Sequence, residues 1–370
     1  MNIVVLGLTV SSSWGNGHAT LWRALGRALA ARRHRVTFFE RDVPYYAAHR
    51  DGTEFPGIDL RLYRDLAELR GPLSAHLLGA DVAIVTSFCP DGNALSRLVC
   101  DAPRPLHVFY DLDTPVTLAK LDAGDAVEYL PAGGLSDFDL VLSYTGGRAL
   151  DALQTRLGAR RTAALYGSVD PDVHHPAPPR DAFSADLSYL GTFAADRQPA
   201  LERLLVEPAR RAPNRRFVIG GAQYPANFPW TSNTFFVRHL PAGDHPAFYA
   251  SSPLTLNVTR AAMAAMGYRP SGRLFEAAAC GAPIITDVWE GLDEFFALGD
   301  ELLPARGADD VLAALELPRA RLAAIARRAR DRVLAEHTAA ARAAQLEGLL
   351  ESALNAPADR PVTRGAACSA

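Results

Sequence analysis

In the first half of the chain, the residues best suited to chemistry follow two apolar segments. Residues 11–18 read SSSWGNGH directly after an apolar run, and their small side chains let a ligand approach the backbone closely. His18 would lie at the first turn of a helix facing a cleft and is a candidate general base, although a capping or surface histidine fits equally well. The remaining residues of this candidate binding loop are Trp14, Gly15, Asn16 and Gly17.

A second candidate group ends the apolar segment 106–110. Asp111 and Asp113 follow it, and two such carboxylates can hold a divalent cation or deprotonate a hydroxyl. Asp113 also precedes a Thr-Pro pair, so it could simply cap a helix. The candidate catalytic residues are therefore His18, Asp113 and Asp111, with capping as the alternative for Asp113.

The second half of the chain places glycines at corresponding positions and adds an arginine-rich helix start. A Gly-Thr pair at 191–192 and a Gly-Gly pair at 220–221 follow its first two apolar segments, where backbone N–H groups can approach a phosphate. Ser271 can cap a helix whose early turns carry Arg273 and Glu276. The helix amino end, with Arg269 and Arg273, suits a diphosphate, and Glu276 could accept hydrogen bonds from ribose hydroxyls. The alternative is a salt bridge between Arg273 and Glu276.

Apolar and helical segments alternate along both halves, and this alternation must position the candidate residues. The apolar segments are continuous, as in the strands of parallel sheets that helices cover on both faces. A proline-rich segment at 168–180 separates the two series. We therefore predict the α/β class, with two Rossmann-like, doubly wound domains facing a cleft. The predicted parts are an amino-terminal domain at 1–170, a carboxy-terminal domain at 171–318, a helical region at 319–354 and a disordered tail at 355–370.

Length and composition agree with this division and exclude several classes of protein. The chain has 370 residues, which suggests two or three domains, and its hydrophobic content of 49% excludes a disordered chain. A net charge of −3 offers nucleic acid no general attraction. No apolar stretch is long enough for a membrane span, and no basic segment precedes the first apolar run, so we expect a cytoplasmic protein.

Metal and cofactor chemistry finds little support in the sequence. The four cysteines are scattered and the ten histidines are dispersed, with His174 in the proline-rich segment, so neither a metal site nor a cofactor is predicted. Lys120 is the only lysine and lies in no Walker phosphate loop. A dinucleotide-binding loop remains the alternative for residues 11–18, because Glu40 lies where a ribose-binding acid would; however, Thr20 stands at the third glycine position.

The block RLFEAAACGAPIITD at 273–287 resembles the donor-binding segment of GT-B glycosyltransferases. More narrowly, the chain resembles the CgeB-like (spore maturation protein type) family, through the motifs SWGNGHAT at 13–20, FYDLDTPVTL at 109–118, YLGTF at 189–193 and NVTR at 257–260. The resemblance implies an amino-terminal domain that takes the acceptor and a carboxy-terminal domain that holds a nucleotide-sugar without an essential metal. It also implies that the region 319–354 packs back onto the amino-terminal domain.

The same resemblance assigns roles to individual residues. Glu276 matches the second glutamate of the E-x7-E motif and would bind the ribose, while Arg273 and nearby backbone would hold the diphosphate. The first glutamate of that motif would fall at Tyr268 and is absent, which leaves the sugar contact and the stereochemistry open. The expected donor-binding residues are Gly191, Thr192, Gly220, Gly221, Asn257, Arg260, Ser271, Gly272, Arg273, Glu276 and Asp287.

These inferences predict an enzyme, a hexosyltransferase-type glycosyltransferase that moves a sugar from a nucleotide-diphospho-sugar to an acceptor hydroxyl or amine. If the reaction inverts the anomeric centre, His18 or Asp113 would be the base. The acceptor, which could be a small molecule, a glycan or a protein, and the oligomeric state stay open. The alternatives are a sugar-nucleotide epimerase of the same fold, a nucleotide-sugar-binding protein without activity and an NAD-dependent oxidoreductase.

Overall fold

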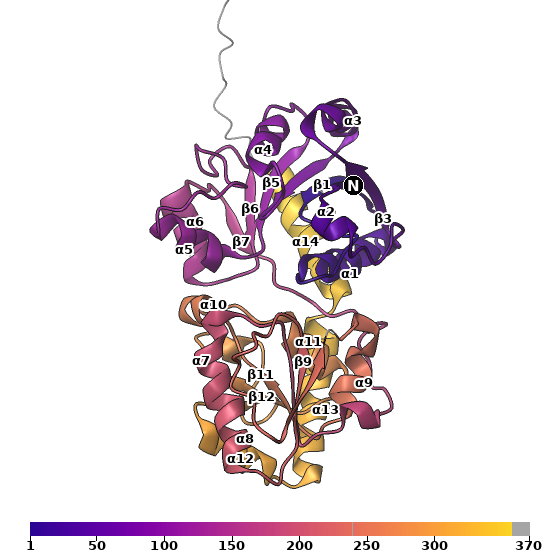
Figure 1. Ribbon diagram of the computed structural model, residues 1–370. Coiled ribbons are helices and arrows are strands. Elements are labelled where there is room, and N and C mark those ends of the chain that lie inside the picture. Colours follow the sequence, from indigo (N-terminus) through magenta and orange to yellow (C-terminus); the bar gives the residue numbers. More distant parts are fainter. Residues whose placement is uncertain (239, 357–370) are drawn as a thin grey trace, which may run out of the picture.

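The computed structural model describes residues 1–238 and 240–356, which form two lobes, one above the other in Figure 1. Each lobe is built around one sheet with helices on both faces, so the predicted α/β class with two doubly wound domains is confirmed. Of the predicted disordered tail, residues 357–370 lie outside the described residues.

The amino-terminal lobe contains a seven-stranded parallel sheet of order β3-β2-β1-β4-β5-β6-β7. Its strands are β1 (Asn2–Gly7), β2 (Arg35–Arg41), β3 (Ile58–Tyr63), β4 (Val82–Thr86), β5 (Leu106–Asp111), β6 (Leu140–Ser143) and β7 (Thr162–Ala164). Its helices are α1 (His18–Ala31), α2 (Pro44–Ala47), α3 (Leu66–Gly79), α4 (Gly92–Cys100), α5 (Thr114–Asp122) and α6 (Arg148–Leu157).

Burial along β1 explains why its apolar run is continuous. Ile3 and Val5 pack into the core that contains α1, whereas Val4 and Leu6 pack into the core that contains α3 and α4. Both faces of the strand are therefore covered, as in other parallel sheets. The apolar pattern does not predict the edge strands β3 and β7, because β3 is partly exposed and β7 has only three residues, none of them fully buried.

The carboxy-terminal lobe contains a six-stranded parallel sheet of order β10-β9-β8-β11-β12-β13. Its strands are β8 (Leu187–Leu190), β9 (Phe217–Gly221), β10 (Thr234–Arg238), β11 (Thr255–Asn257), β12 (Ile284–Asp287) and β13 (Leu303–Ala305). The helices that follow β8 and the later strands are α7 (Gln198–Leu201), α8 (Glu207–Arg211), α9 (His245–Ala250), α10 (Ala261–Met266), α11 (Gly272–Ala279), α12 (Ala308–Leu315), α13 (Arg319–Glu336) and α14 (Ala339–Leu354). In both sheets the strand order reverses beside the first strand, where doubly wound sheets form ligand crevices.

The helical region 319–354 divides between the lobes at His337. Helix α13 packs against α11 and contributes Ala329 and Val333 to the core of the carboxy-terminal lobe. Helix α14 packs against α1 and contributes Leu346 and Leu350 to the amino-terminal core, as the yellow helix beside α1 in Figure 1 shows. Only the second half of the region therefore packs back onto the amino-terminal lobe, because the buried apolar residues of α13 pack into the two cores of the carboxy-terminal lobe.

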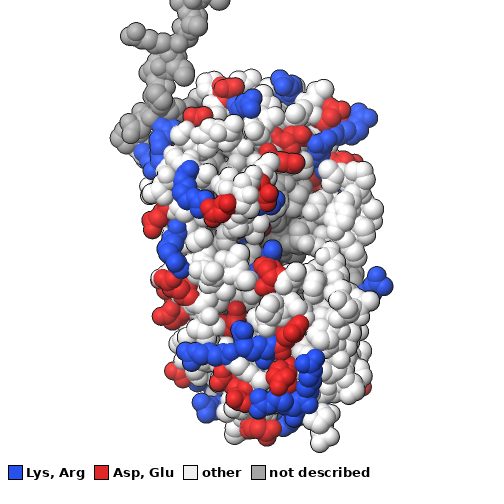
Figure 2. All heavy atoms as spheres, turned by 60° about the vertical axis from the view of Figure 1, so that its left-hand side comes forward, with Lys and Arg blue, Asp and Glu red and all other residues white. Residues whose placement is uncertain are grey.

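Acidic and basic side chains are intermixed on the face shown in Figure 2, as the small net charge suggests. This distribution offers no broad basic surface on that face for nucleic acid. Within residues 1–238 and 240–356, no helix combines the length and the apolar character that crossing a membrane would require.

Candidate active site

A cavity of about 320 Å³ lies between the two lobes and gathers candidate residues from both. Its amino-terminal wall includes Gly17, His18 and Asp113, which follow strands β1 and β5. Its carboxy-terminal wall includes Gly272 and Glu276 of α11. The cavity thus lies beyond the carboxyl ends of the strands of the first sheet, where ligands of doubly wound folds bind.

The loop after β1 is held by a buried carboxylate, that of Glu40 in β2. Glu40 accepts hydrogen bonds from the backbone N–H groups of Val10 and Ser11 at 2.7 and 2.9 Å and from the hydroxyl groups of Thr9 and Ser11. These four hydrogen bonds occupy the carboxylate completely. Glu40 therefore supports the loop and is not available to a ribose, which argues against the dinucleotide-binding alternative.

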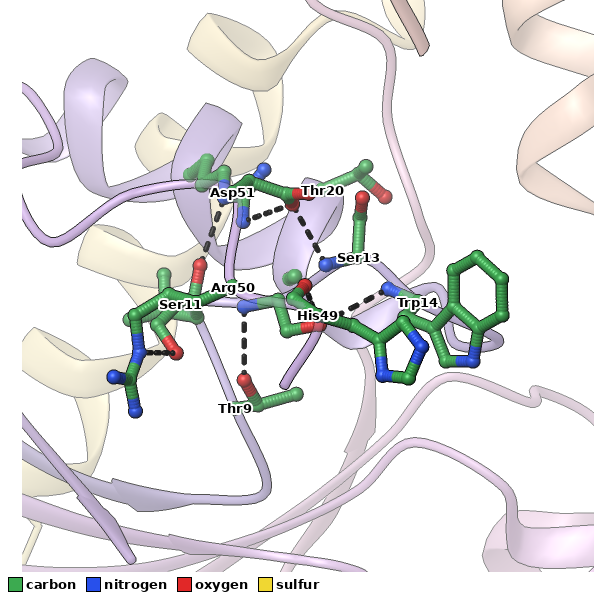
Figure 3. A network of polar contacts seen from close by, with 12 residues as sticks. Thr9, Ser11, Ser13, Trp14, Thr20, His49, Arg50 and Asp51 are labelled. Carbon is green, nitrogen blue, oxygen red and sulfur yellow. Dashed lines mark hydrogen bonds and ion pairs between the residues drawn. The ribbon is translucent and has the colours of Figure 1, made fainter. Parts of the chain in front are cut away.

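The tip of this loop presents an aromatic edge (Figure 3). The ring of Trp14 stacks on that of His49 with centroids 4.2 Å apart, while the backbone N–H of Ser13 donates to Asp51 at 2.8 Å. Gly15 has a left-handed backbone (φ 68°), and a side chain there would lie close to Gln223 of the other lobe. Of the predicted binding loop, Gly17 lines the cavity, whereas Trp14 stacks on His49 at the tip of the loop.

Asn16 fixes the position of His18 at the start of α1. Its Oδ1 accepts hydrogen bonds from the backbone N–H groups of His18 and Ala19 at 3.0 and 3.2 Å. Asn16 thus satisfies two donors that the first turn of a helix leaves free. The imidazole of His18 is buried, with 8% of the residue exposed, and lines the cavity.

Asp113 contacts both His18 of its own lobe and Arg269 of the opposite lobe. Its Oδ2 lies 3.5 Å from Nε2 of His18, and its Oδ1 accepts a hydrogen bond from Arg269 at 2.8 Å. Burial acts to raise the pKa of Asp113, but the hydrogen bond from His18 and the charge of Arg269 outweigh it and lower the pKa. Asp113 occupies the N-cap position of α5, yet within the described residues its side chain makes no capping hydrogen bond. Nδ1 of His18 has no hydrogen-bond partner among the described residues.

Asp111 takes a different position from the one expected for a catalytic residue. It is fully buried and absent from the cavity wall, and its Oδ1 accepts a hydrogen bond from the backbone N–H of Asp113 at 3.0 Å. Burial raises the pKa of Asp111 to about 6. The structure therefore does not bring the two carboxylates together on the cavity wall, because the chain turns between them and Asp111 faces the interior.

In the carboxy-terminal lobe, Gly191, directly after β8, packs against Gly220 and Gly221, the last two residues of β9. The backbone N–H of Gly191 donates to the carbonyl of Gly220 at 2.8 Å, and a side chain on Gly221 would collide with the carbonyl of Gly191. A Cβ atom on Gly191 would lie 2.6 Å from the hydroxyl of Tyr189 and 2.9 Å from Nη1 of Arg273. These glycines are therefore required for close packing around Arg273.

Two arginines meet at the carboxyl end of β8. Arg273 donates to the carbonyl of Leu190 at 2.7 Å, and Arg197 donates to the hydroxyl of Tyr189 at 3.1 Å and to the carbonyl of Thr192 at 3.0 Å. Within the described part of the chain, neither guanidinium forms an ion pair with a carboxylate. Burial and the positive charge of Arg273 lower the pKa of Arg197. Such a pair of cations with neutral partners is suited to an anion.

Sequence reasoning did not single out Arg197. It lies in a turn shortly after the YLGTF motif, and the only signal was its proximity to that motif in a chain that has many arginines. The tertiary structure identifies it, because only the fold places Arg197 beside Arg273 and Tyr189.

Three other predicted residues are engaged within the protein. Arg260 forms an ion pair with Asp196 at 3.1 Å. Asp287 accepts hydrogen bonds from the backbone and the side chain of Thr259 at 3.0 and 3.1 Å. Asn257 donates to the hydroxyl of Thr286 at 3.0 Å. These contacts hold the loops after β11 and β12 in place, and the role of the three residues in donor binding stays a prediction.

Helix α11 begins as the sequence predicts. Ser271 is its N-cap and accepts a hydrogen bond from the backbone N–H of Arg273 at 3.3 Å, and Gly272 is the first helical residue. Glu276 lies one turn further along and lines the cavity. Among the described residues, Glu276 and Arg273 form no salt bridge with each other, because Arg273 turns toward Leu190.

Two histidines lie beside Glu276, and no motif in the sequence predicts this arrangement. His245, the first residue of α9, has its Nδ1 3.9 Å from Oε2 of Glu276. His174, from the proline-rich segment, has its ring centroid 5.9 Å from that of His245. Burial lowers the pKa of His245. The three side chains come from distant parts of the sequence and meet only in the folded chain.

Tyr268, at the position of the absent glutamate, contributes to the contact between the lobes. Its ring lies against Gly147 of the amino-terminal lobe and Gly291 of its own lobe, and its backbone is left-handed (φ 48°). The carbonyl of Tyr268 accepts a hydrogen bond from the backbone N–H of Gly146 at 3.0 Å. Where the resemblance leads one to expect a glutamate, this chain therefore has an aromatic ring that packs between the two lobes.

Comparison with known proteins agrees with this geometry. A family model described as glycosyl transferase-like matches residues 197–348, which include most of the carboxy-terminal lobe and part of α14. No curated protein matches the sequence.

Solved glycosyltransferase structures share the whole architecture. Sucrose-phosphate synthase from Thermosynechococcus elongatus is 16% identical, with a TM-score of 0.67 over 95% of this chain and 99% of that one. HepE from Anabaena, solved with UDP-glucose, is 13% identical, with a TM-score of 0.69 over 95% of this chain and all of that one. The catalytic domain of starch synthase IV from Arabidopsis thaliana is 11% identical, with a TM-score of 0.69 over 96% and 99% of the two chains.

These similarities define the class of fold, the two-domain GT-B fold of glycosyltransferases. Within that class, the carboxy-terminal half of this chain carries the glycosyl transferase-like sequence pattern. The narrower resemblance to CgeB-like enzymes stays a prediction.

Proposed function

We propose that the protein is a metal-independent glycosyltransferase that moves a hexose from a nucleotide-diphospho-sugar to an acceptor hydroxyl or amine. The observation that carries the proposal is the pair of arginines, Arg197 and Arg273, at the carboxyl end of β8, both without a carboxylate partner in the described part of the chain. A diphosphate would supply the missing negative charge. The same guanidinium groups would stabilise the charge that develops on the diphosphate as the glycosidic bond breaks.

The donor would extend from these arginines along α11. Glu276 lies one turn beyond Arg273 and lines the cavity, so its carboxylate can accept hydrogen bonds from the ribose. HepE, which has the same fold, has been solved with UDP-glucose and with UDP. Uridine diphosphate sugars are therefore the first donors to test.

The acceptor would bind against the amino-terminal wall, beside His18. Asp113 faces Nε2 of His18, which favours the tautomer protonated at Nε2 and leaves Nδ1 able to accept a proton. In an inverting reaction, His18 would remove the proton of the acceptor as the new bond forms, and Asp113 would stabilise the resulting imidazolium. Arg269 keeps Asp113 ionised for this task.

Calorimetry of the full chain with UDP, GDP and TDP tests the donor assignment. We expect one of them to bind, and absence of binding by all three to a folded protein would contradict the assignment. Replacing Arg273 with alanine should weaken binding by at least about tenfold, since a charge-assisted hydrogen bond contributes about 1.5–3 kcal/mol. Arg210→Ala is the matched control, because Arg210 is an exposed arginine of α8 in the same lobe.

A further inference from the structure

Three potential metal ligands converge at the edge of the interlobe cavity. They are His174 from the proline-rich segment, His245 from the start of α9 and Glu276 from α11. One ligand atom from each lies within 4.8 Å of the others, and the shortest of these distances that involves Glu276 is 3.9 Å, to Nδ1 of His245. His174 and Glu276 also line the cavity, so an ion could reach the cluster from there.

The histidines of this cluster lack the partners that buried imidazoles normally have. His174 is only 7% exposed, yet neither of its ring nitrogens has a hydrogen-bond partner among the described residues. Nδ1 of His245 is buried and unpartnered in the same sense. Buried polar groups are usually hydrogen-bonded, because leaving one unpaired costs about 1–3 kcal/mol. Three nitrogens without a partner among the described residues, beside one carboxylate, are therefore available to a ligand.

We infer that His174, His245 and Glu276 bind one divalent transition-metal ion of the zinc class. Two imidazoles and one carboxylate form a ligand set that suits Zn²⁺ or Co²⁺, whereas Mg²⁺ and Ca²⁺ prefer oxygen ligands. Ligands about 2.1 Å from a tetrahedral ion lie about 3.4 Å apart, so small side-chain rotations close the present distances. Three protein ligands leave the fourth position open to water.

The site has a consequence for the donor, and this part of the inference rests on the proposed function. Glu276 is also the residue that we assign to the ribose. A carboxylate that coordinates a metal ion cannot accept the ribose hydrogen bonds in the same geometry, so the ion and the donor compete for Glu276. The metal would therefore inhibit transfer rather than support it.

Metal titration of the chelator-treated full chain tests the site. We expect one Zn²⁺ per chain by calorimetry and, with Co²⁺, the visible absorption of a tetrahedral site. His174→Gln and His245→Gln should each weaken binding by at least about tenfold, because even the loss of partners that orient metal ligands costs that much. His175→Gln is the matched control: His175 is the exposed neighbour whose Nδ1 already lies 3.1 Å from the carbonyl of Pro176.

The titration distinguishes a metal site from a pair of packed histidine rings. Absence of Zn²⁺ binding, or binding that His174→Gln and His245→Gln leave unchanged, would overturn the site and leave the two histidines as packed rings. Since both ring nitrogens of His174 are unpaired, His174→Gln removes no side-chain hydrogen bond within the described residues, whereas His245→Gln affects the hydrogen bond of His245 with the backbone of Leu240. Thermal unfolding confirms that both variants are folded.

Competition with the donor is measured separately. UDP is first titrated into the metal-free protein, so that a failure of the proposed function shows itself without metal. With Zn²⁺ held at about tenfold its own Kd, we then expect competition to weaken UDP binding by roughly tenfold in the original chain and not in His174→Gln. Unchanged UDP affinity in saturating Zn²⁺ would overturn the competition.

Discussion

The loops after the first strand of each sheet occupy equivalent positions. The buried charge at the first loop is satisfied by hydrogen bonds from the loop itself, whereas the buried charges at the second have no opposite charge paired with them among the described residues. After β1, the carboxylate of Glu40 receives four hydrogen bonds from the loop itself. After β8, the guanidinium groups of Arg197 and Arg273 find only carbonyl and hydroxyl groups as hydrogen-bond partners among the described residues. The loop after β1 therefore satisfies its buried charge without a ligand, and we call it the balanced loop. The loop after β8 does not, and we call it the unbalanced loop.

This difference distinguishes a buried charge that the fold itself satisfies from buried charges that remain available to a ligand. Burying an ionised group is costly unless the protein pairs it and satisfies its hydrogen bonds, as the amino-terminal loop does. The carboxy-terminal lobe instead keeps two cations side by side, an arrangement that costs stability in the free protein. In the proposed function, the unbalanced loop would receive the charged part of the substrate, and the balanced loop would provide a rigid wall for the uncharged part.

The largest effect, on kcat, is expected at His18, which follows the balanced loop at the start of α1. Replacing it with alanine removes the proposed base, so kcat should fall by about 10²–10⁴-fold, while UDP affinity should not change. Steady-state kinetics and calorimetry measure the two quantities. His175→Ala, a change at an exposed histidine outside the cavity wall, controls for the loss of an imidazole. A His18 variant that keeps most of its activity would show that this wall does no acid–base work.

The next largest effect is on stability, at Glu40. In Glu40→Leu, the buried N–H groups of Val10 and Ser11 lose their acceptor, which should lower the free energy of unfolding by roughly 2–6 kcal/mol. Glu40→Gln should cost less, because its carbonyl still accepts both N–H groups and the hydroxyls can turn to accept from its amide. Denaturant unfolding measures both. Equal losses in the two variants would contradict the proposed role of the hydrogen bonds.

The junction between α13 and α14 allows a test that leaves both loops intact. His337 stacks on Phe275 and accepts a hydrogen bond from Arg342 at 2.8 Å; burial and the charge of Arg342 lower its pKa to about 4. Between that value and the ordinary one of about 6.5, the folded state binds fewer protons than the unfolded state. Stability is therefore lost as the pH falls through this window, by up to about 3 kcal/mol.

His337→Gln should remove this contribution. The amide can still accept from Arg342 but does not titrate, so the variant should lose less stability than the original chain on acidification. Unfolding curves recorded at neutral pH and across the window give the difference between the two proteins. Curves that shift in parallel would show that another group controls the acid sensitivity.

The smallest effect on stability is expected at Arg197, the cation of the unbalanced loop. Arg197→Met loses two hydrogen bonds but relieves repulsion from Arg273, so the free energy of unfolding should change by less than about 1 kcal/mol. Its affinity for UDP should fall by at least about tenfold. Arg203→Met, at an exposed arginine nearby, is the control. Strong destabilisation of Arg197→Met would show that both loops are structural.

Much of the fold could be predicted from local pattern. The continuous apolar strands predicted two parallel sheets, and Ser271 with its following glycine predicted the start of α11. The same reasoning missed edge strands such as β3, because strands with one exposed side lack the continuous apolar signal. It also treated 319–354 as one unit, because the turn at His337 has no proline or glycine to mark it.

The sequence by itself determined the two-domain α/β class, the glycine loops after the strands and the position of α11, since these depend on hydrophobic periodicity and local backbone preference. Only the tertiary structure directs Asp111 into the interior and Asp113 toward the cavity, and only it places Arg197 beside Arg273. It also shows that the carboxylate of Glu40 accepts hydrogen bonds from the loop after β1. It alone assembled His174, His245 and Glu276. The physical reason is that burial and electrostatic partners are properties of neighbours in space, and a linear sequence does not specify which distant residues those neighbours are.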